Sequence, residues 1–290
     1  MSSFNKGILY ILIGSFWWGV IGVIYFRSVS FVGSIELVLH RVIWTVVMLI
    51  ITTFYLSKWN NVKKILSIKK NIYYLILTGF LIFINWSVWI YAVSTNQIID
   101  ASFGYFIMPI LSVLFGYLFF NEILNRRRVF SIFLTIISVV YLFYFNKNFP
   151  WIGLIVGLSW SLYNVFRKKI NVDVDLGLLI ESLVILPFAL IAIYLVYSSG
   201  NLDFGIKSIN LSLLLTIAGP MTVIPLFFFI KGVLLSGLGP SGMLFFITPT
   251  FQFILGLFLY NEPFDTKRLI GFILIWVAVI IYIFDLYEKN

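Results

Sequence analysis

The chain contains no cysteine and one histidine, and only 11% of its 290 residues are charged. Without cysteine it has no disulfide framework, no thiolate nucleophile and no soft metal site. A single histidine with no other ligand cluster cannot form a zinc site, so we expect neither a metal nor another cofactor. The sequence also lacks a Walker-type glycine-lysine loop, which argues against ATP as the direct energy source.

Apolar and aromatic side chains are abundant instead, at 61% and 19% of the residues. With a mean hydropathy of +1.06, this composition indicates a membrane protein. The apolar stretches have about the 17–25 residues that a spanning helix needs, and they lack the short alternation of a barrel. The first is expected to be a permanent span, because no convincing signal-peptide cleavage site follows it. We predict an all-α membrane protein with ten transmembrane helices, near residues 7–26, 35–56, 72–93, 99–120, 128–145, 151–166, 176–197, 211–231, 239–260 and 268–285.

Two stretches of the chain, 79–122 and 219–262, align at a constant offset of 140 without a gap. Five helices per half is an odd number, so the second half must be inverted in the membrane relative to the first. We predict two inverted five-helix repeats, 1–148 and 149–290, whose shared interface suits alternating access. The matching pairs are Gly79 with Gly219, Pro109 with Pro249, Gly116 with Gly256, Asn121 with Asn261, and Glu122 with Glu262.

The basic residues predict the orientation. With the N-terminus in the cytoplasm, 14 of the 20 Lys and Arg residues fall in cytoplasmic segments, five fall outside and Arg41 lies within a span. Both termini are therefore expected to be cytoplasmic. Because topology accounts for the basic excess, we expect no nucleic-acid partner.

Charged side chains inside spans are costly and point to function. The second expected helix carries Glu36, His40 and Arg41, and Glu181 occupies the matching part of the seventh. Arg41 is predicted to anchor a carboxylate, either on the substrate or on a protein partner such as Glu36. His40 could titrate near neutral pH and couple transport to protons, or it could be a hydrogen-bonded packing residue. Glu36 could also simply snorkel to the surface.

Proline and aromatic residues mark the expected pathway. Pro109 and Pro249 are predicted to interrupt the fourth and ninth helices in mid-span and Pro225 the eighth, so these helices should line a central cavity. Several aromatic and amide residues lie too deep for an interfacial belt, which suggests an aromatic-walled pocket for a small organic molecule. These pathway candidates are Trp17, Asn85, Trp86, Tyr105, Tyr163 and Asn164.

Several segments carry a family resemblance. They are ELVLHRVIW (36–44), NWSVWIYAV (85–93), ASFGYFIMPI (101–110), FRKKI (166–170), LLIES (178–182), TPTF (248–251) and YNEP (260–263). In these the chain resembles the RarD proteins, of the EamA group in the drug/metabolite transporter superfamily. The resemblance implies ten helices in two inverted repeats, in a bacterial inner membrane. It also implies secondary export or exchange of small metabolites, amino acids or drugs.

The leading hypothesis is thus a secondary transporter of a small amino-acid-like or amphipathic, drug-like molecule, with export as the expected direction. A lipid flippase is one alternative. A membrane-embedded enzyme using Glu36 and His40 is another, disfavoured because so few titratable groups are present. A duplicated scaffold is the least favoured, because nothing outside the membrane is large enough. The sequence leaves the coupling ion, with protons as a candidate, and the oligomeric state open.

Overall fold

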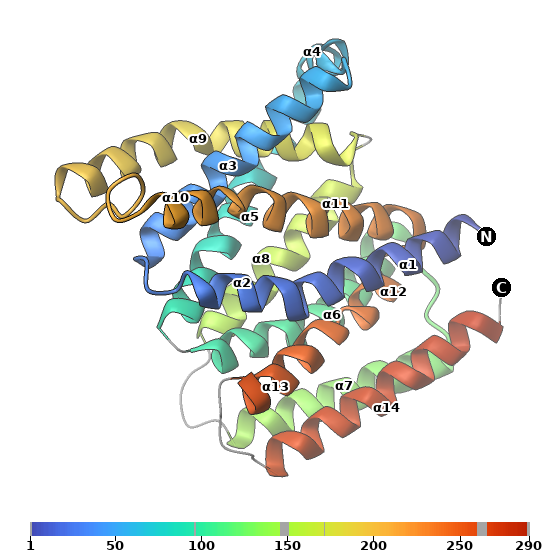
Figure 1. Cartoon of the computed structure of the whole chain (residues 1–290). Helices are drawn as coiled ribbons and strands as arrows, with labels where there is room; N and C mark the ends of the chain where they lie inside the picture. Colours follow the sequence, from blue (N-terminus) through green and yellow to red (C-terminus); the bar gives the residue numbers. More distant parts are fainter. Residues whose placement is uncertain (1, 96, 146–150, 171, 260–265, 289–290) are drawn as a thin grey trace.

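The computed structural model describes residues 2–95, 97–145, 151–170, 172–259 and 266–288, and its regular structure over these ranges is helical (Figure 1). Eight helical stretches there are long and apolar enough to cross a membrane, and Ile107–Phe120 is a shorter apolar helix. The elements are α1 Ser3–Phe16, η1 Trp17–Ile21, α2 Gly22–Ser28, α3 Ser34–Tyr55, α4 Trp59–Leu66, α5 Lys69–Ser94, α6 Ile98–Phe120, α7 Arg126–Phe145, α8 Trp151–Lys168, α9 Val174–Ser198, α10 Ile209–Thr216, α11 Ala218–Ser236, α12 Leu238–Leu244, α13 Ile247–Leu259 and α14 Thr266–Glu288.

The predicted all-α membrane class is confirmed. Each expected range coincides with one helix or with a run of broken helices, while the ten-span count and the inversion stay predictions. The predicted boundary between the halves, at 148 and 149, lies outside the described residues, as do Asn261 and Glu262.

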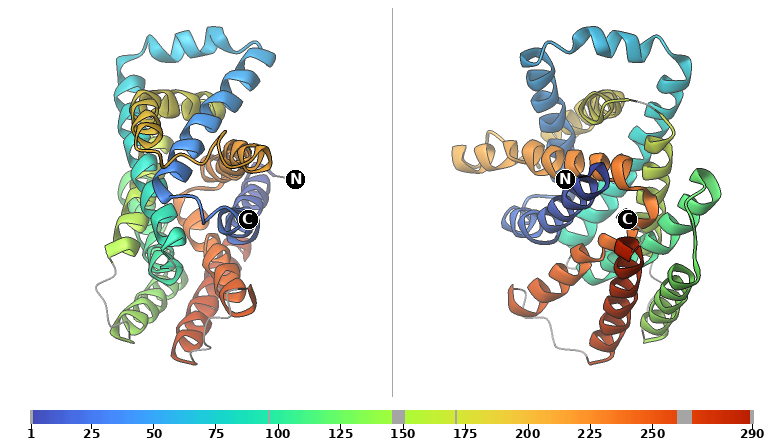
Figure 2. Two further views of the ribbon diagram at one scale, coloured as in Figure 1. Left: turned by 60° about the vertical axis from the view of Figure 1, so that its left-hand side comes forward. Right: turned by 90° about the vertical axis from the view of Figure 1, so that its right-hand side faces the viewer.

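One helix, α4, lies where the sequence suggested a connection. It bridges the ends of α3 and α5 (Figure 2). Its eight residues are too few to span a bilayer, and it buries Val62 while exposing Lys63 and Lys64. This amphipathic pattern is typical of a helix that lies along a membrane surface.

Three of the expected helices are interrupted. The first contains the π-helical turn η1, whose wider turn separates α1 from α2. The eighth changes from α10 to α11 at Ile217. The ninth divides into α12 and α13 around Phe245 and Phe246.

The break in the ninth helix corrects the prediction for Pro249. This residue is the third of α13, in its first turn, and not in mid-helix. Proline has no N–H to donate to the carbonyl four residues earlier, which is that of Phe245. The Thr248 N–H donates to the Phe245 carbonyl instead, at 2.9 Å, and so tightens the chain into a turn before α13 begins. Pro109 and Pro225, by contrast, lie inside the continuous helices α6 and α11.

The helix packing pairs elements from the two halves of the chain. α1 packs against α11, α8 against both α5 and α6, α3 against α9, and α7 against α14. The pair α7 and α14 lies side by side along the lower edge of Figure 1, and a separate apolar cluster joins it to α6 and α12. The main apolar core fills the space between the remaining helices.

The repeated glycines Gly79 and Gly219 lie where helices from opposite halves approach closely. A Cβ on Gly79 of α5 would lie 3.0 Å from the Glu181 carbonyl oxygen of α9. A Cβ on Gly219 of α11 would overlap the Trp44 carbonyl oxygen of α3. Both contacts are backbone to backbone, so a side chain at either position would force the helices apart.

Candidate functional site

Arg41 is the charged group at the centre of the candidate site. It follows the first turns of α3, and its side chain is only 5% exposed. Its Nε donates to the Thr222 hydroxyl on α11 at 2.9 Å, and its guanidinium carbon lies 4.6 Å from the centre of the Trp86 ring. No carboxylate oxygen of the described residues lies within 4.0 Å of it, so the alternative of a Glu36 partner is not realised.

Arg41 faces a cavity of about 30 Å³. This volume is below the range of about 300–1,000 Å³ typical of small-molecule sites, so a substrate needs the walls to move apart. The walls come from α2, α3, α5, α6, α8, η1 and the chain just after α12. The lining residues are Trp18, Gly22, Phe26, Arg41, Asn85, Trp86, Trp89, Tyr105, Trp160 and Phe245.

The cavity brings together four of the residues predicted from sequence, namely Arg41, Asn85, Trp86 and Tyr105, although they come from three helices. Asn85 is fixed by donating its amide to the Val156 carbonyl at 2.9 Å. Sequence analysis missed the lining roles of Trp160 and Phe245, which come from the second half of the chain. The internal repeat is the signal that could have indicated these two residues. Trp160 follows Trp17 at an offset of 143, and Phe245 follows Tyr105 at an offset of 140.

Tyr105 and Phe245 occupy equivalent positions relative to the repeated prolines. Each lies four residues before a proline, Pro109 or Pro249, at the carbonyl that the proline cannot bond. Their ring centres lie 5.2 Å apart in the cavity wall. Helix α6 and the chain just after α12 thus contribute to the cavity at equivalent points of the two halves.

Other predicted residues lie away from the lining. Trp17 belongs to η1 with its indole Nε1 buried and unpartnered among the described residues, while its neighbour Trp18 faces the cavity. Tyr163 and Asn164 are buried in α8, and the Asn164 amide donates to the Trp160 carbonyl at 2.9 Å. Asn164 therefore contacts the backbone of Trp160, which lines the cavity.

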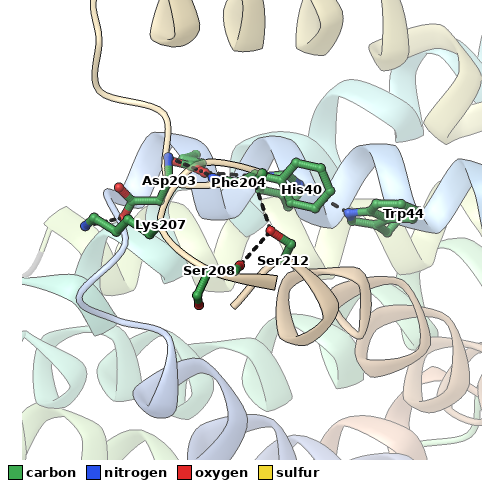
Figure 3. Close-up of polar contacts among 9 residues, drawn as sticks. His40, Trp44, Asp203, Phe204, Lys207, Ser208 and Ser212 are labelled. Carbon is green, nitrogen blue, oxygen red and sulfur yellow. Dashed lines mark hydrogen bonds and ion pairs between the residues drawn. The ribbon is translucent and has the colours of Figure 1, made fainter. Parts of the chain in front are cut away.

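His40 faces a different region, beside the segment between α9 and α10 (Figure 3), and Glu36 contacts the same segment. The Glu36 carboxylate is 2% exposed and accepts the backbone N–H groups of Asp203 and Phe204, at 3.0 and 2.9 Å. His40 Nδ1 accepts from the Trp44 indole at 3.2 Å, and its Nε2 lies 3.4 Å from Glu36. Glu36 therefore does not snorkel to the surface. Its hydrogen bonds hold the loop to α3, and the His40 ring packs against that of Phe204, with ring centres 4.7 Å apart.

Glu181 has a third kind of environment. It is fully buried on α9 and accepts hydrogen bonds from Thr78 at 2.7 Å and from Tyr163 at 3.1 Å. Arg167 Nε lies 3.3 Å away, and the side chain of Arg167 fits because Gly177 has no Cβ. Glu36 and Glu181 are thus both buried, but one binds backbone N–H groups and the other a cation and two hydroxyls.

The repeated residues Gly116, Asn121 and Glu122 form a latch that sequence analysis did not interpret. Asn121 ends α6 in the left-handed conformation, with φ of 53°. Glu122 then turns back beside Gly116, where a Cβ would lie 2.6 Å from its Oε2. The Glu122 carboxylate accepts the first N–H groups of α12, from Leu238 at 2.7 Å and Gly239 at 2.8 Å, and pairs with Lys168 at 2.7 Å.

Comparison with known proteins identifies the type of molecule. The pattern of the EamA-like transporter family matches residues 5–144. The sequence is 33% identical to the uncharacterized transporter YojE of Bacillus subtilis (strain 168), over 97% of this chain and 94% of that protein. The chain belongs to the EamA transporter family, in its RarD group. It is therefore a membrane transporter of the drug/metabolite superfamily, and the predicted resemblance is confirmed.

Further relatives of this EamA transporter agree. It is 31% identical to protein RarD of Escherichia coli (strain K12), over 97% of this chain and 95% of that protein. It is 24% identical to the chloramphenicol-sensitive protein RarD of Pseudomonas aeruginosa, over 86% of this chain and 84% of that protein. A solved crystal structure with 14% identity superposes with a TM-score of 0.66, over 95% of this chain and 96% of its own, and this likeness concerns the fold alone.

Proposed function

We propose that this chain is a secondary transporter that carries a small organic metabolite across the bacterial inner membrane, with export as its direction. The observation that carries the proposal is the Arg41 cavity, an aromatic chamber enclosed by helices from both halves of the chain. A lining of aromatic rings with a few polar groups suits a single amphipathic molecule once the walls move apart in the transport cycle.

Alternating access between two inverted five-helix repeats is the mechanism that we propose. The packing supports it, because the main contacts between the spanning helices have counterparts when the halves are exchanged. The contact of α1 with α11 corresponds to that of α8 with α5, and the contact of α3 with α11 to that of α9 with α5. Exchange of the halves leaves two pairs unchanged, because α3 and α9 are equivalent helices that contact each other, as are α7 and α14.

The positions of the cavity and the latch fit one end of such a cycle. Arg41 lies near the beginning of α3, and Phe26 and Trp89 lie near the ends of α2 and α5. The cavity is thus displaced toward the connections that the basic residues predict to be outside. The Glu122 latch joins the connections predicted to be cytoplasmic, at Lys168 and at the start of α12.

The alternatives have less support. The enzyme hypothesis needs Glu36 and His40 beside a substrate, whereas both side chains contact the loop after α9 and neither lines the cavity. For the flippase hypothesis, no described feature favours a lipid over a smaller molecule.

Counterflow in proteoliposomes tests the proposal. Vesicles containing the purified chain are loaded with one unlabelled compound from a panel of amino acids, nucleosides and amphipathic drugs, and uptake of the labelled compound is followed. The name of the Pseudomonas aeruginosa relative justifies including chloramphenicol. We expect transient accumulation of at least one compound, and vesicles without protein are the background.

A cavity-filling variant makes this test specific. A Cβ on Gly22 would lie at ordinary contact distances, 3.5 Å from the Trp17 carbonyl oxygen and 3.8 Å from Trp18. Gly22→Phe should therefore fill the cavity while the chain still folds, and counterflow should disappear. Gly33→Phe is the matched control, because nothing lies within 4 Å of a Cβ there. Undiminished counterflow in folded Gly22→Phe would show that the substrate passes elsewhere.

A further inference from the structure

The charge balance of the Arg41 cavity indicates which class of molecule it accepts. Among the described lining residues, Arg41 is the charged side chain, and the others are aromatic rings, one amide and one glycine. A guanidinium has five N–H donors, and the single hydrogen bond to Thr222 uses the one on Nε. The remaining four have no acceptor among the described residues.

Two further donors lie in the same walls. The indole Nε1 atoms of Trp89 and Trp160 are buried and have no hydrogen-bond partner among the described residues. Buried donors without acceptors are costly, and a charged group in a membrane interior is costlier still. Contacts with the Phe26, Trp86 and Trp89 rings, 4.6–6.0 Å from the guanidinium carbon, compensate only part of this cost.

We propose that the cavity binds an organic monocarboxylate whose body is aromatic or otherwise apolar, with the carboxylate on Arg41 and the body between the rings. This inference rests on the proposed transport function and specifies its substrate class. A carboxylate presents two acceptor oxygens that match the planar fork of a guanidinium. One positive charge balances one carboxylate, whereas a phosphate monoester carries about −1.5 to −2 at neutral pH and would stay uncompensated.

The same walls disfavour an ammonium group. A zwitterionic amino acid needs an anion for its α-ammonium, but the described lining has no carboxylate and Arg41 adds repulsion. The Asn85 and Tyr105 oxygens are neutral acceptors, and they leave that charge unpaired. Compounds that lack the amino group, such as aryl-substituted carboxylic acids, should therefore bind better than the related amino acids.

Four ligands with the same phenyl ring test this inference on the full-length protein in nanodiscs. They are 3-phenylpropionate, 2-phenylethanol, L-phenylalanine and 2-phenylethylamine, and calorimetric titration measures their affinity. We expect 3-phenylpropionate to bind most tightly and 2-phenylethylamine most weakly. In Arg41→Gln, affinity for 3-phenylpropionate should fall about 10- to 100-fold, while affinity for 2-phenylethanol stays within about threefold.

Two further variants separate a binding role from a structural one. Arg41→Lys keeps the charge but loses the planar fork, so its affinity for the carboxylate should lie between those of wild type and Arg41→Gln. Arg126→Gln, which removes an exposed arginine at the start of α7, should bind like wild type. If Arg41→Gln does not fold, the order of the four ligands on the wild type still decides the question.

The inference is overturned if the wild-type protein binds 3-phenylpropionate no more tightly than 2-phenylethanol or L-phenylalanine. It is also overturned if Arg41→Gln binds 3-phenylpropionate with unchanged affinity. Failure of the proposed function has a different signature. If carboxylate binding depends on Arg41 but no bound compound undergoes counterflow, the substrate class stands and transport through this cavity does not. If amino acids undergo counterflow that does not depend on Arg41, the proposed transport function stands and the carboxylate substrate class is refuted.

Discussion

Glu36 and Arg41 are five residues apart on α3, yet their environments are opposite. Glu36 is satisfied by the backbone N–H groups of Asp203 and Phe204, whereas Arg41 has no anion among the described residues and faces a cavity. Because each residue turns the helix by about 100°, the two side chains lie on different faces of α3. Glu36, held by the loop backbone, therefore has a structural role, whereas Arg41 is placed to bind a ligand.

Replacing Glu36 by Gln should lower stability. The amide retains one acceptor oxygen and presents an NH₂ group where Glu36 now accepts two backbone N–H groups, so part of the loop anchor is lost. We expect a loss of about 1–3 kcal/mol in the free energy of unfolding, measured by thermal denaturation in detergent. Glu288→Gln is the control, because that side chain is 60% exposed. Equal transition temperatures for the two variants would refute the anchoring role of Glu36.

The sequence was informative about residues whose cost in lipid is evident, and less so about their partners. Arg41, Asn85, Trp86 and Tyr105 stand out as polar or bulky residues within apolar spans, and the structure places them together. Trp160 and Phe245 look like lipid-facing aromatics until the helices are packed. The Arg167 pairing with Glu181 was equally hidden, because the arginine lies at the end of α8, where a cytoplasmic connection was expected.

At the level of elements, hydropathy alone was enough to locate the helices, because each must satisfy its backbone within lipid. It could not predict the divisions within them. The π-helical turn at Trp17 and the break at Phe245 depend on local hydrogen bonds, and α4 on the amphipathic order of a short lysine-rich segment. Of the repeated glycines, Gly79 and Gly219 lie at helix crossings, whereas Gly116 makes room for the Glu122 side chain.

Alanine at the two repeated glycines should destabilise the fold to different degrees. Gly219→Ala places a methyl group against the Trp44 carbonyl oxygen with overlap, whereas Gly79→Ala leaves 3.0 Å to the Glu181 carbonyl oxygen. We expect Gly219→Ala to lose about 1–3 kcal/mol of stability and Gly79→Ala less, by denaturation in detergent. Gly33→Ala, with nothing within 4 Å, should change stability least. The reverse order would contradict the packing described for α3 with α11.

The Glu122 latch can be examined by accessibility. The chain has no cysteine, so a single Leu238→Cys substitution at the start of α12 reports on its own, and Leu238 is 1% exposed. Adding Glu122→Gln removes a charge that now binds two N–H groups of α12 and Lys168. Maleimide labelling should then become about 10-fold faster, because about 1–2 kcal/mol of local stability is lost. Glu288→Gln in the same background serves as control, and equal rates would show that Glu122 does not hold α12.

At the scale of the whole molecule, the basic residues and the helix connections make a joint prediction about orientation. The first turn of α1 and the last turn of α14 lie at the same end of the molecule (Figure 1 and Figure 2), as an even number of spans requires. Single cysteines at Asn60 and Asn201 should lie on opposite sides of the membrane. With an impermeant maleimide, intact cells should be labelled at Asn201→Cys and not at Asn60→Cys, and permeabilised cells at both. The opposite pattern would invert the proposed topology.

Energy coupling is the last property that the whole molecule must supply, and Glu181 is the candidate that the structure leaves. Glu36 is committed to a loop, whereas Glu181 is fully buried between α5, α8 and α9, where helices of the two halves meet. In its partner Arg167, Nε and Nη1 have no hydrogen bonds among the described residues. Protonation of Glu181 would therefore leave a buried, unpaired guanidinium. The helices would have to move to give this charge a new partner.

We therefore expect Glu181→Gln to abolish accumulation against a gradient while equilibrative exchange continues, because the Arg41 cavity remains intact. Uptake into vesicles with an imposed pH step or membrane potential measures this, with wild type and Glu36→Gln in parallel. Glu36→Gln should remain coupled despite its lower stability, since its carboxylate does not line the cavity. Wild-type uptake that is indifferent to both gradients would indicate a uniporter. The burial of Glu181 beside Arg167 would then serve to hold α8 against α9, and the driving force would be the substrate gradient alone.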